Sequence, residues 1–93
     1  MSVLSENLRY LRAQKNCAQQ QVANDLIISR GRYSKYEDGK SEPPLDILKL
    51  ISQYFEVSID LLISVDLRFV PLEDRSSGLL QKYLLLMYSG SKK

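Results

Sequence analysis

The sequence has no histidine, no tryptophan and a single cysteine, Cys17, among its 93 residues. A chain without histidine lacks the commonest general base, the usual partner of a catalytic serine or cysteine, and the commonest metal ligand. One cysteine can form neither an internal disulfide nor a multi-cysteine metal cluster, which is typical of a reducing compartment. These absences argue against most enzyme classes, and we expect a protein without catalytic activity, metal or cofactor.

Long apolar runs are also missing. No stretch approaches the roughly 20 consecutive apolar residues that span a bilayer, and the first residues lack the basic and apolar segments of a signal peptide. We therefore expect a cytoplasmic protein with no membrane partner. The composition, 44% hydrophobic and 26% charged, is that of one globular domain. A formal net charge of +2 is too small to indicate a nucleic-acid partner, so the spatial distribution of the charges has to decide.

Apolar residues recur at helical spacing in five short stretches, and this pattern predicts an all-α protein. The expected helices run from about Leu4 to Lys15, from near Ala18 to Leu26, from Arg30 to about Asp38, from Leu45 to Phe55, and from Ile59 to Leu62 after a cap at Ser58. Because no convincing strand precedes Val65, we expect a five-helix orthogonal bundle.

The third expected helix separates its charges from its apolar residues. Ser29 is a good N-cap for this helix, and Gly39 is a good stop. One side of the helix carries Tyr33, Tyr36 and Glu37, whereas Arg30, Gly31, Ser34 and Lys35 project largely away from them. Two short helices joined by a tight turn form a helix-turn-helix, which places its second helix in the major groove of DNA.

The sequence changes character after Ser64. Residues 65–69 alternate apolar and charged side chains, which favours an extended, strand-like arm, and the run from Leu79 to Tyr88 is densely apolar. We expect residues 1–64 to form a DNA-binding domain and residues 65–93 to form an extended or helical C-terminal arm with an apolar segment. That segment is predicted to dimerise the protein; packing on the chain's own core and binding of a different protein are the alternatives.

Four stretches together resemble the Cro-like, or XRE, family of phage-repressor DNA-binding domains. They are "LRYLRAQKN", "QQQVANDL", "SRGRYSKYEDGKSEPP" and "LDILKLISQYFEVSIDLL", which lie in this order between about Leu4 and Leu62. The resemblance implies a lambda-repressor-like fold. It also implies a sequence-specific regulator of transcription, expected to be a repressor, that binds double-stranded DNA as a homodimer.

The resemblance also implies roles for individual residues. Arg30, Gly31 and Lys35 occupy the positions that face base edges, while Gln19, Arg32, Ser34 and Lys40 lie where phosphates are contacted. Arginine can pair bidentately with guanine, whereas lysine reaches the same acceptors as a point charge. Gly31 has no side chain with which to read a base, so its use would be close approach of the helix backbone to DNA, or the position simply tolerates glycine. For the other residues the alternative is an ordinary solvated side chain.

Three further positions bear on the geometry of the third helix. Arg12 and Glu37 match a pair that forms a salt bridge between the first and third helices in the family. Ile27 stands where the family usually has a turn glycine, so either the turn differs or burial of Ile27 offsets the strain. Tyr33 is expected to place its ring in the core and its hydroxyl at a polar edge, within reach of a phosphate.

Two other classes of function remain for comparison. An antitoxin-type module would use the tail from Leu67 to Tyr88 to bind a partner protein, with DNA binding as a secondary activity. RNA binding is disfavoured, because the tyrosines have the spacing of a helical core rather than of a sheet on which bases stack.

Overall fold

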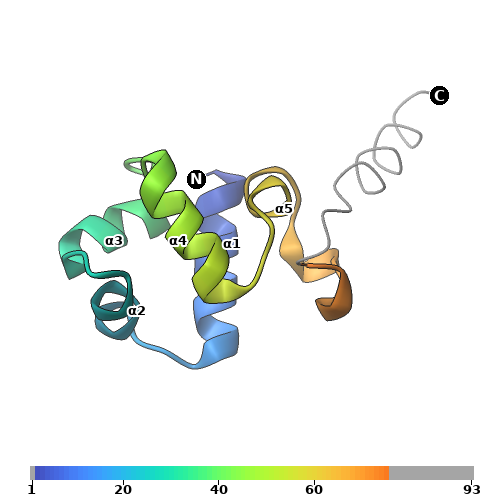
Figure 1. Cartoon of the computed structure of the whole chain (residues 1–93), viewed down its shortest axis with the longest axis horizontal. Helices are drawn as coiled ribbons and strands as arrows, with labels where there is room; N and C mark the ends of the chain where they lie inside the picture. The colour runs from blue at the N-terminus through green and yellow to red at the C-terminus, as the bar shows by residue number, and fades with distance from the viewer. Residues whose placement is uncertain (1, 76–93) are drawn as a thin grey trace.

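The computed structural model describes residues 2–75, and these form helices and loops without a strand (Figure 1). The elements are α1 (Val3–Lys15), α2 (Gln19–Leu26), α3 (Arg30–Glu37), α4 (Leu45–Phe55), α5 (Ile59–Ser64) and the short 3-10 helices η1 (Leu67–Phe69) and η2 (Leu72–Asp74). The prediction of an all-α bundle containing a helix-turn-helix is confirmed. No helix in the described part of the chain is long and apolar enough to cross a membrane.

One hydrophobic core holds the five α-helices together. Each helix contributes a side chain with no exposed surface: Leu8, Val22, Tyr33, Ile51 and Leu61. Helix α1 packs against α3 and α5, and α2 packs against α3 and α4. Since full burial of such a side chain contributes about 1.5–3 kcal/mol, this core fixes the position of α3.

Serine hydroxyls cap three of the helices at their N-termini. Ser2, Ser29 and Ser58 each accept a hydrogen bond from the backbone N–H three residues later, at 3.0, 3.1 and 3.3 Å. Each cap satisfies one of the N–H groups that a helix start leaves without a partner.

Helices α1, α2 and α4 end in the same way, with a residue in the left-handed conformation. These residues are Asn16, Ile27 and Glu56, with φ between 56° and 61°. The backbone N–H that follows reaches the carbonyl five residues back in each case, at 3.0–3.2 Å, as in a Schellman motif. The next side chain then packs on the core: Cys17, Ile28 or Val57.

The turn at Ile27 overturns both expectations for this position. The turn keeps its left-handed geometry, with φ 61° and ψ 44°, and the Ile27 side chain is not buried but 90% exposed. The hydrophobic contact that stabilises this helix end comes instead from Ile28, which packs on the core. The geometry of the turn is therefore maintained at the cost of strain in a β-branched residue.

The alternating pattern after Ser64 had indicated a strand-like arm, but the structure has none at these positions. The Asp66 carboxylate accepts a hydrogen bond from the Arg68 backbone N–H at 3.0 Å and starts the turn of η1. Val65, Leu67 and Val70 are buried against the bundle. The division of the chain after Ser64 stays a prediction, but the residues that follow it are part of the same core.

Two polar side chains fasten this segment to α1. Asn7, which is 2% exposed, donates to the carbonyls of Leu62 and Val65, both at 2.8 Å, and accepts from the Leu67 N–H at 3.0 Å. Arg75, which is 6% exposed, donates to the Gln14 side chain and the Tyr10 hydroxyl. The apolar run from Leu79 to Tyr88, predicted to dimerise the protein, lies outside the described residues.

Candidate nucleic-acid interface

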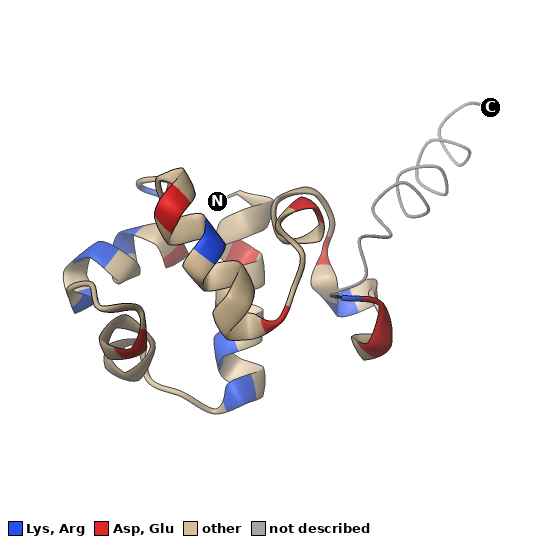
Figure 2. Cartoon of the chain, viewed as in Figure 1, with Lys and Arg blue, Asp and Glu red and all other residues tan. Residues whose placement is uncertain are grey.

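Helix α3 presents one basic face to solvent and buries the other. Arg30, Gly31, Arg32 and Lys35 are exposed and Ser34 is half-buried, whereas Tyr33, Tyr36 and Glu37 are buried. Basic residues follow one another along this helix at one end of the long axis of the molecule (Figure 2). The cations are therefore concentrated on α3, although the net charge of the whole chain is only +2.

An open hollow of about 590 Å³ adjoins this face. It is lined by residues of α3 and of the loop that leads to α4: Ser29, Gly31, Arg32, Lys35, Tyr36, Ser41, Glu42 and Pro44. The hollow is open, and its lining carries two cations, Arg32 and Lys35, and one carboxylate, Glu42. It is therefore not an enclosed site for a small ligand.

Gly31 has open space around it. A Cβ atom built on Gly31 would meet no other atom within 4 Å, and its backbone has helical geometry without a positive φ. Nothing in the free protein therefore requires glycine at this position. Its helix propensity is about 1 kcal/mol worse than that of alanine, so glycine here brings the helix itself no advantage.

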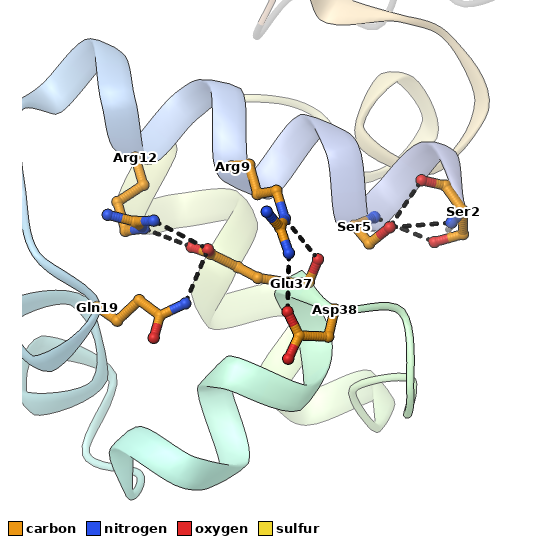
Figure 3. A network of polar contacts seen from close by, with 7 residues as sticks. All are labelled: Ser2, Ser5, Arg9, Arg12, Gln19, Glu37 and Asp38. Carbon is orange, nitrogen blue, oxygen red and sulfur yellow. Dashed lines mark hydrogen bonds and ion pairs between the residues drawn. The ribbon is translucent and has the colours of Figure 1, made fainter.

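A polar network fixes α3 to α1 and α2 (Figure 3). The Arg12 guanidinium donates from Nε to Glu37 Oε2 at 2.6 Å and from Nη2 to Oε1 at 3.1 Å. Gln19 adds a hydrogen bond from Nε2 to Glu37 Oε1 at 3.1 Å. The structure thus brings together the two partners of the expected salt bridge, and Gln19 joins them.

The charge state of Glu37 follows from this network. Burial alone would raise the pKa of its carboxyl, but the hydrogen bonds from Arg12 and Gln19 outweigh burial, and the pKa lies below its usual value. The pKa of Arg12 is raised, mainly by its hydrogen bond to Glu37. Both groups are therefore charged at neutral pH, as an intact pair requires.

Gln19 and Lys40 lie outside α3 in the sequence, one before it and one after it. Gln19 lies at the first position of α2, is half-buried and points toward Glu37 (Figure 3). Lys40 is exposed in the loop after α3, and its backbone N–H bonds to the Lys35 carbonyl at 2.9 Å. Gln19 thus stands at the start of the helix-turn-helix and Lys40 just after its end.

The Tyr33 hydroxyl does not lie at a polar edge, where the sequence had led us to expect it. The whole side chain has no exposed surface, so its hydroxyl lies at no edge that a phosphate can reach. The hydroxyl is buried near Glu37 but completes no hydrogen bond, and burial raises its pKa well above the usual value. Tyr33 is a core residue that packs the buried face of α3 against the hydrophobic core.

Sequence reasoning missed a second link between α1 and α3. Arg9 donates from Nε to the Glu37 backbone carbonyl at 3.0 Å and from Nη2 to Asp38 Oδ1 at 2.8 Å (Figure 3). The position of Arg9 three residues before Arg12 is a signal that could have found it, because residues at this spacing share one face of a helix.

Comparison with known proteins agrees with this geometry. A sequence model of a family described as helix-turn-helix matches residues 8–62, which include all of α2 and α3. The chain belongs to the XRE family of helix-turn-helix transcriptional regulators. Members of this class bind double-stranded DNA, and the family is one of regulators rather than enzymes. No solved structure matches the chain significantly.

Three relatives illustrate the range of the family. A transcriptional activator, BcrR of Enterococcus faecalis, is 47% identical over 60 residues, which are 64% of this chain and 29% of that protein. The phage CTXphi repressor RstR of Vibrio cholerae is 29% identical over 62 residues, 67% of this chain and 56% of RstR. The antitoxin PezA of Streptococcus pneumoniae is 31% identical over 72 residues, 77% of this chain and 46% of PezA. This chain therefore spans about half, or less, of each of these relatives.

Proposed function

We propose that this protein is a sequence-specific double-stranded DNA-binding repressor that places α3 in the major groove. The observation that carries the proposal is the division of α3 into two faces. Its buried face is fixed by Tyr33, Tyr36 and Glu37, so its cationic face is held in one orientation before DNA arrives. Such preorganisation reduces the entropy that binding would otherwise cost.

The outward residues divide by chemistry into two groups. Arg30 and Lys35 read base edges; a bidentate arginine–guanine pair discriminates by about 1–3 kcal/mol against a wrong base. Gly31 lets the helix backbone approach the DNA closely. Gln19, Arg32, Ser34 and Lys40 contact phosphates, and the Gln19 amide keeps a second N–H for this purpose after bonding to Glu37.

The protein acts as a homodimer in the cytoplasm. Two copies would place their α3 helices in successive turns of the major groove, about 34–36 Å apart. The apolar run from Leu79 to Tyr88 supports this assembly, because its density of apolar residues suits a subunit interface. The resemblance to a phage repressor supports repression, whereas the relative BcrR carries the name of an activator.

Selection of DNA from a random duplex pool at fixed salt tests the proposal. A two-fold symmetric motif is expected, with half-sites about one helical turn apart. Arg30→Ala should remove the preference for the selected motif over random duplex, whereas Arg32→Ala should weaken binding to both alike. Failure to enrich any motif would argue against sequence-specific binding. Equal weakening by Arg30→Ala on both duplexes would argue against base recognition by Arg30.

A second candidate function is that of an antitoxin. The match to PezA extends over 72 residues, more than the matches to the other two relatives described. In this case the tail would hold a partner protein, and that partner would co-purify from the native host in a fixed ratio. Truncation should be made after Arg75 rather than after Ser64, because Val65, Leu67 and Val70 belong to the core. Loss of the partner on this truncation supports the antitoxin; absence of a partner supports the repressor.

A further inference from the structure

The C-terminal end of α3 carries a charge that does not suit a DNA-binding surface. Asp38, the C-cap residue of α3, follows Glu37 directly and has a side chain that is 35% exposed. A carboxylate at this end of a helix is unfavourable beside the helix dipole. It also lies only two residues before Lys40, hence within about 8 Å of it along the backbone, so it would repel a phosphate held by Lys40.

Arg9 of α1 lies directly against this carboxylate. Its Nη2 is 2.8 Å from Asp38 Oδ1, and its Nε is 3.0 Å from the Glu37 carbonyl oxygen (Figure 3). One guanidinium thus contacts both negative groups at this helix end: the carboxylate and the backbone carbonyl. Arg9 is 50% exposed, so the pair lies at the surface and is worth little to folding, about 0–1 kcal/mol.

We propose that Arg9 is a positioning residue for DNA binding that cancels the charge of Asp38, so that the C-terminal end of α3 can approach the phosphate backbone. This inference rests on the proposed function. Arg12 and Arg9 then have different tasks on α1. Arg12 neutralises a buried carboxylate inside the protein, and Arg9 neutralises a surface carboxylate where the protein meets its ligand.

Coulomb's law gives the size of the effect. A unit charge about 7 Å from a phosphate changes binding by roughly threefold in water. At about 0.1 M salt, screening over a Debye length of about 10 Å roughly halves this interaction energy. With about two phosphates inside that length, loss of the Arg9 charge should weaken binding about two- to threefold. The ratio between wild type and variant should shrink toward one as salt is raised, because screening shortens the reach of the uncancelled carboxylate.

The test measures the affinity of the full chain for a duplex selected from a random pool. We expect Arg9→Met to weaken binding, Arg9→Lys to restore most of the loss, and Asp38→Asn to restore affinity in the Arg9→Met background. The matched control is Arg68→Met, which breaks another surface ion pair, Arg68 with Asp66 at 2.6 Å. That pair lies on η1, at the other end of the long axis from α3, and its loss should leave affinity unchanged (Figure 1).

Three results would overturn the inference. If Asp38→Asn does not restore DNA affinity in the Arg9→Met protein, Arg9 acts through its contact with the Glu37 carbonyl and not through the charge of Asp38. If Arg68→Met weakens DNA binding as much as Arg9→Met does, only the net charge of the protein matters. If the loss of affinity is the same at every salt concentration, charge cancellation is excluded. Thermal unfolding of each variant shows whether the fold is intact. Wild-type binding to the duplex tests the proposed function itself: its absence overturns both proposals, whereas binding without rescue overturns the role of Arg9 alone.

Discussion

Gly31→Ala should affect folding and DNA binding in opposite directions. Gly31 has helical geometry in α3, and an added methyl group would meet no atom within 4 Å. Alanine restricts the unfolded chain and is the better helix former, so it should stabilise the fold by about 0.4–1 kcal/mol. For a domain of this size, that corresponds to a rise in Tm of roughly 2–8 °C.

The same methyl group lies on the face proposed to approach DNA. If the backbone of α3 comes as close to the bases as the choice of glycine indicates, the Cβ atom will hold it away. A tenfold loss of affinity, about 1.4 kcal/mol, is the expected size of this effect. The gain in stability then appears together with a loss of function, as is common where a binding site constrains the sequence.

Calorimetry and a binding titration at fixed salt measure the two effects on the same preparation. Gly39→Ala is the matched control for stability, because Gly39 has φ 72° and alanine there should lower Tm. Undiminished affinity of the Gly31→Ala protein would refute the close-approach argument and make the glycine merely tolerated. A lower Tm for this variant would refute the assignment of an unstrained helical backbone with free space around it.

Three other substitutions test the fold that supports the interface. Ile27→Gly should raise the free energy of unfolding measured in urea by about 1 kcal/mol, because it removes the strain of a β-branched residue in the left-handed conformation. A lower free energy of unfolding would show that the exposed Ile27 side chain contributes to folding. Asn7→Ala should lower the free energy of unfolding by about 3 kcal/mol, because three buried backbone groups lose their hydrogen-bond partner. A decrease below about 1 kcal/mol would mean that water replaces the Asn7 amide. The pKa of Glu37 is lower in the folded protein than in the unfolded chain, where it is about 4.3. Ionised Glu37 therefore stabilises the fold at pH values above the unfolded pKa, and this stabilisation is lost as the pH falls through the folded pKa. The stability gap between wild type and Glu37→Gln should therefore be widest near neutral pH and narrow in acid; a gap independent of pH would contradict the network.

The sequence was sufficient for the helices because their signals are local. Apolar spacing predicts α1, α2, α4 and α5, and a serine cap with a glycine stop predicts α3. The link from Asn7 to Leu67 joins residues 60 positions apart, and no pattern around either residue specifies that pairing. A weaker signal was present, since Asn7 lies between Leu4, Leu8 and Leu11 on the apolar face of its helix.

The alternating pattern at residues 65–69 failed for a physical reason. Alternation predicts a strand only if the backbone has another strand to pair with, and none is present among residues 2–75. The Asp66 side chain instead satisfies the N–H of Arg68, and Asn7 satisfies that of Leu67. Side-chain hydrogen bonds to the backbone therefore decided the local structure where periodicity alone was ambiguous.

Helix α3 is a poor helix by its own sequence, and this bears on how the protein can change its target. Eight residues that include Gly31 would not hold a helix in water, so its stability comes from tertiary contacts. Those contacts lie on the inward side, in Tyr33, Tyr36 and Glu37. Arg30 and Lys35 contribute almost nothing to them, since both are exposed and make no hydrogen bond or ion pair through their side chains in the described part of the chain. The residues proposed to read DNA, Arg30 and Lys35, should therefore be exchangeable with little loss of folding stability, whereas Tyr33, Tyr36 and Glu37 behind them should not.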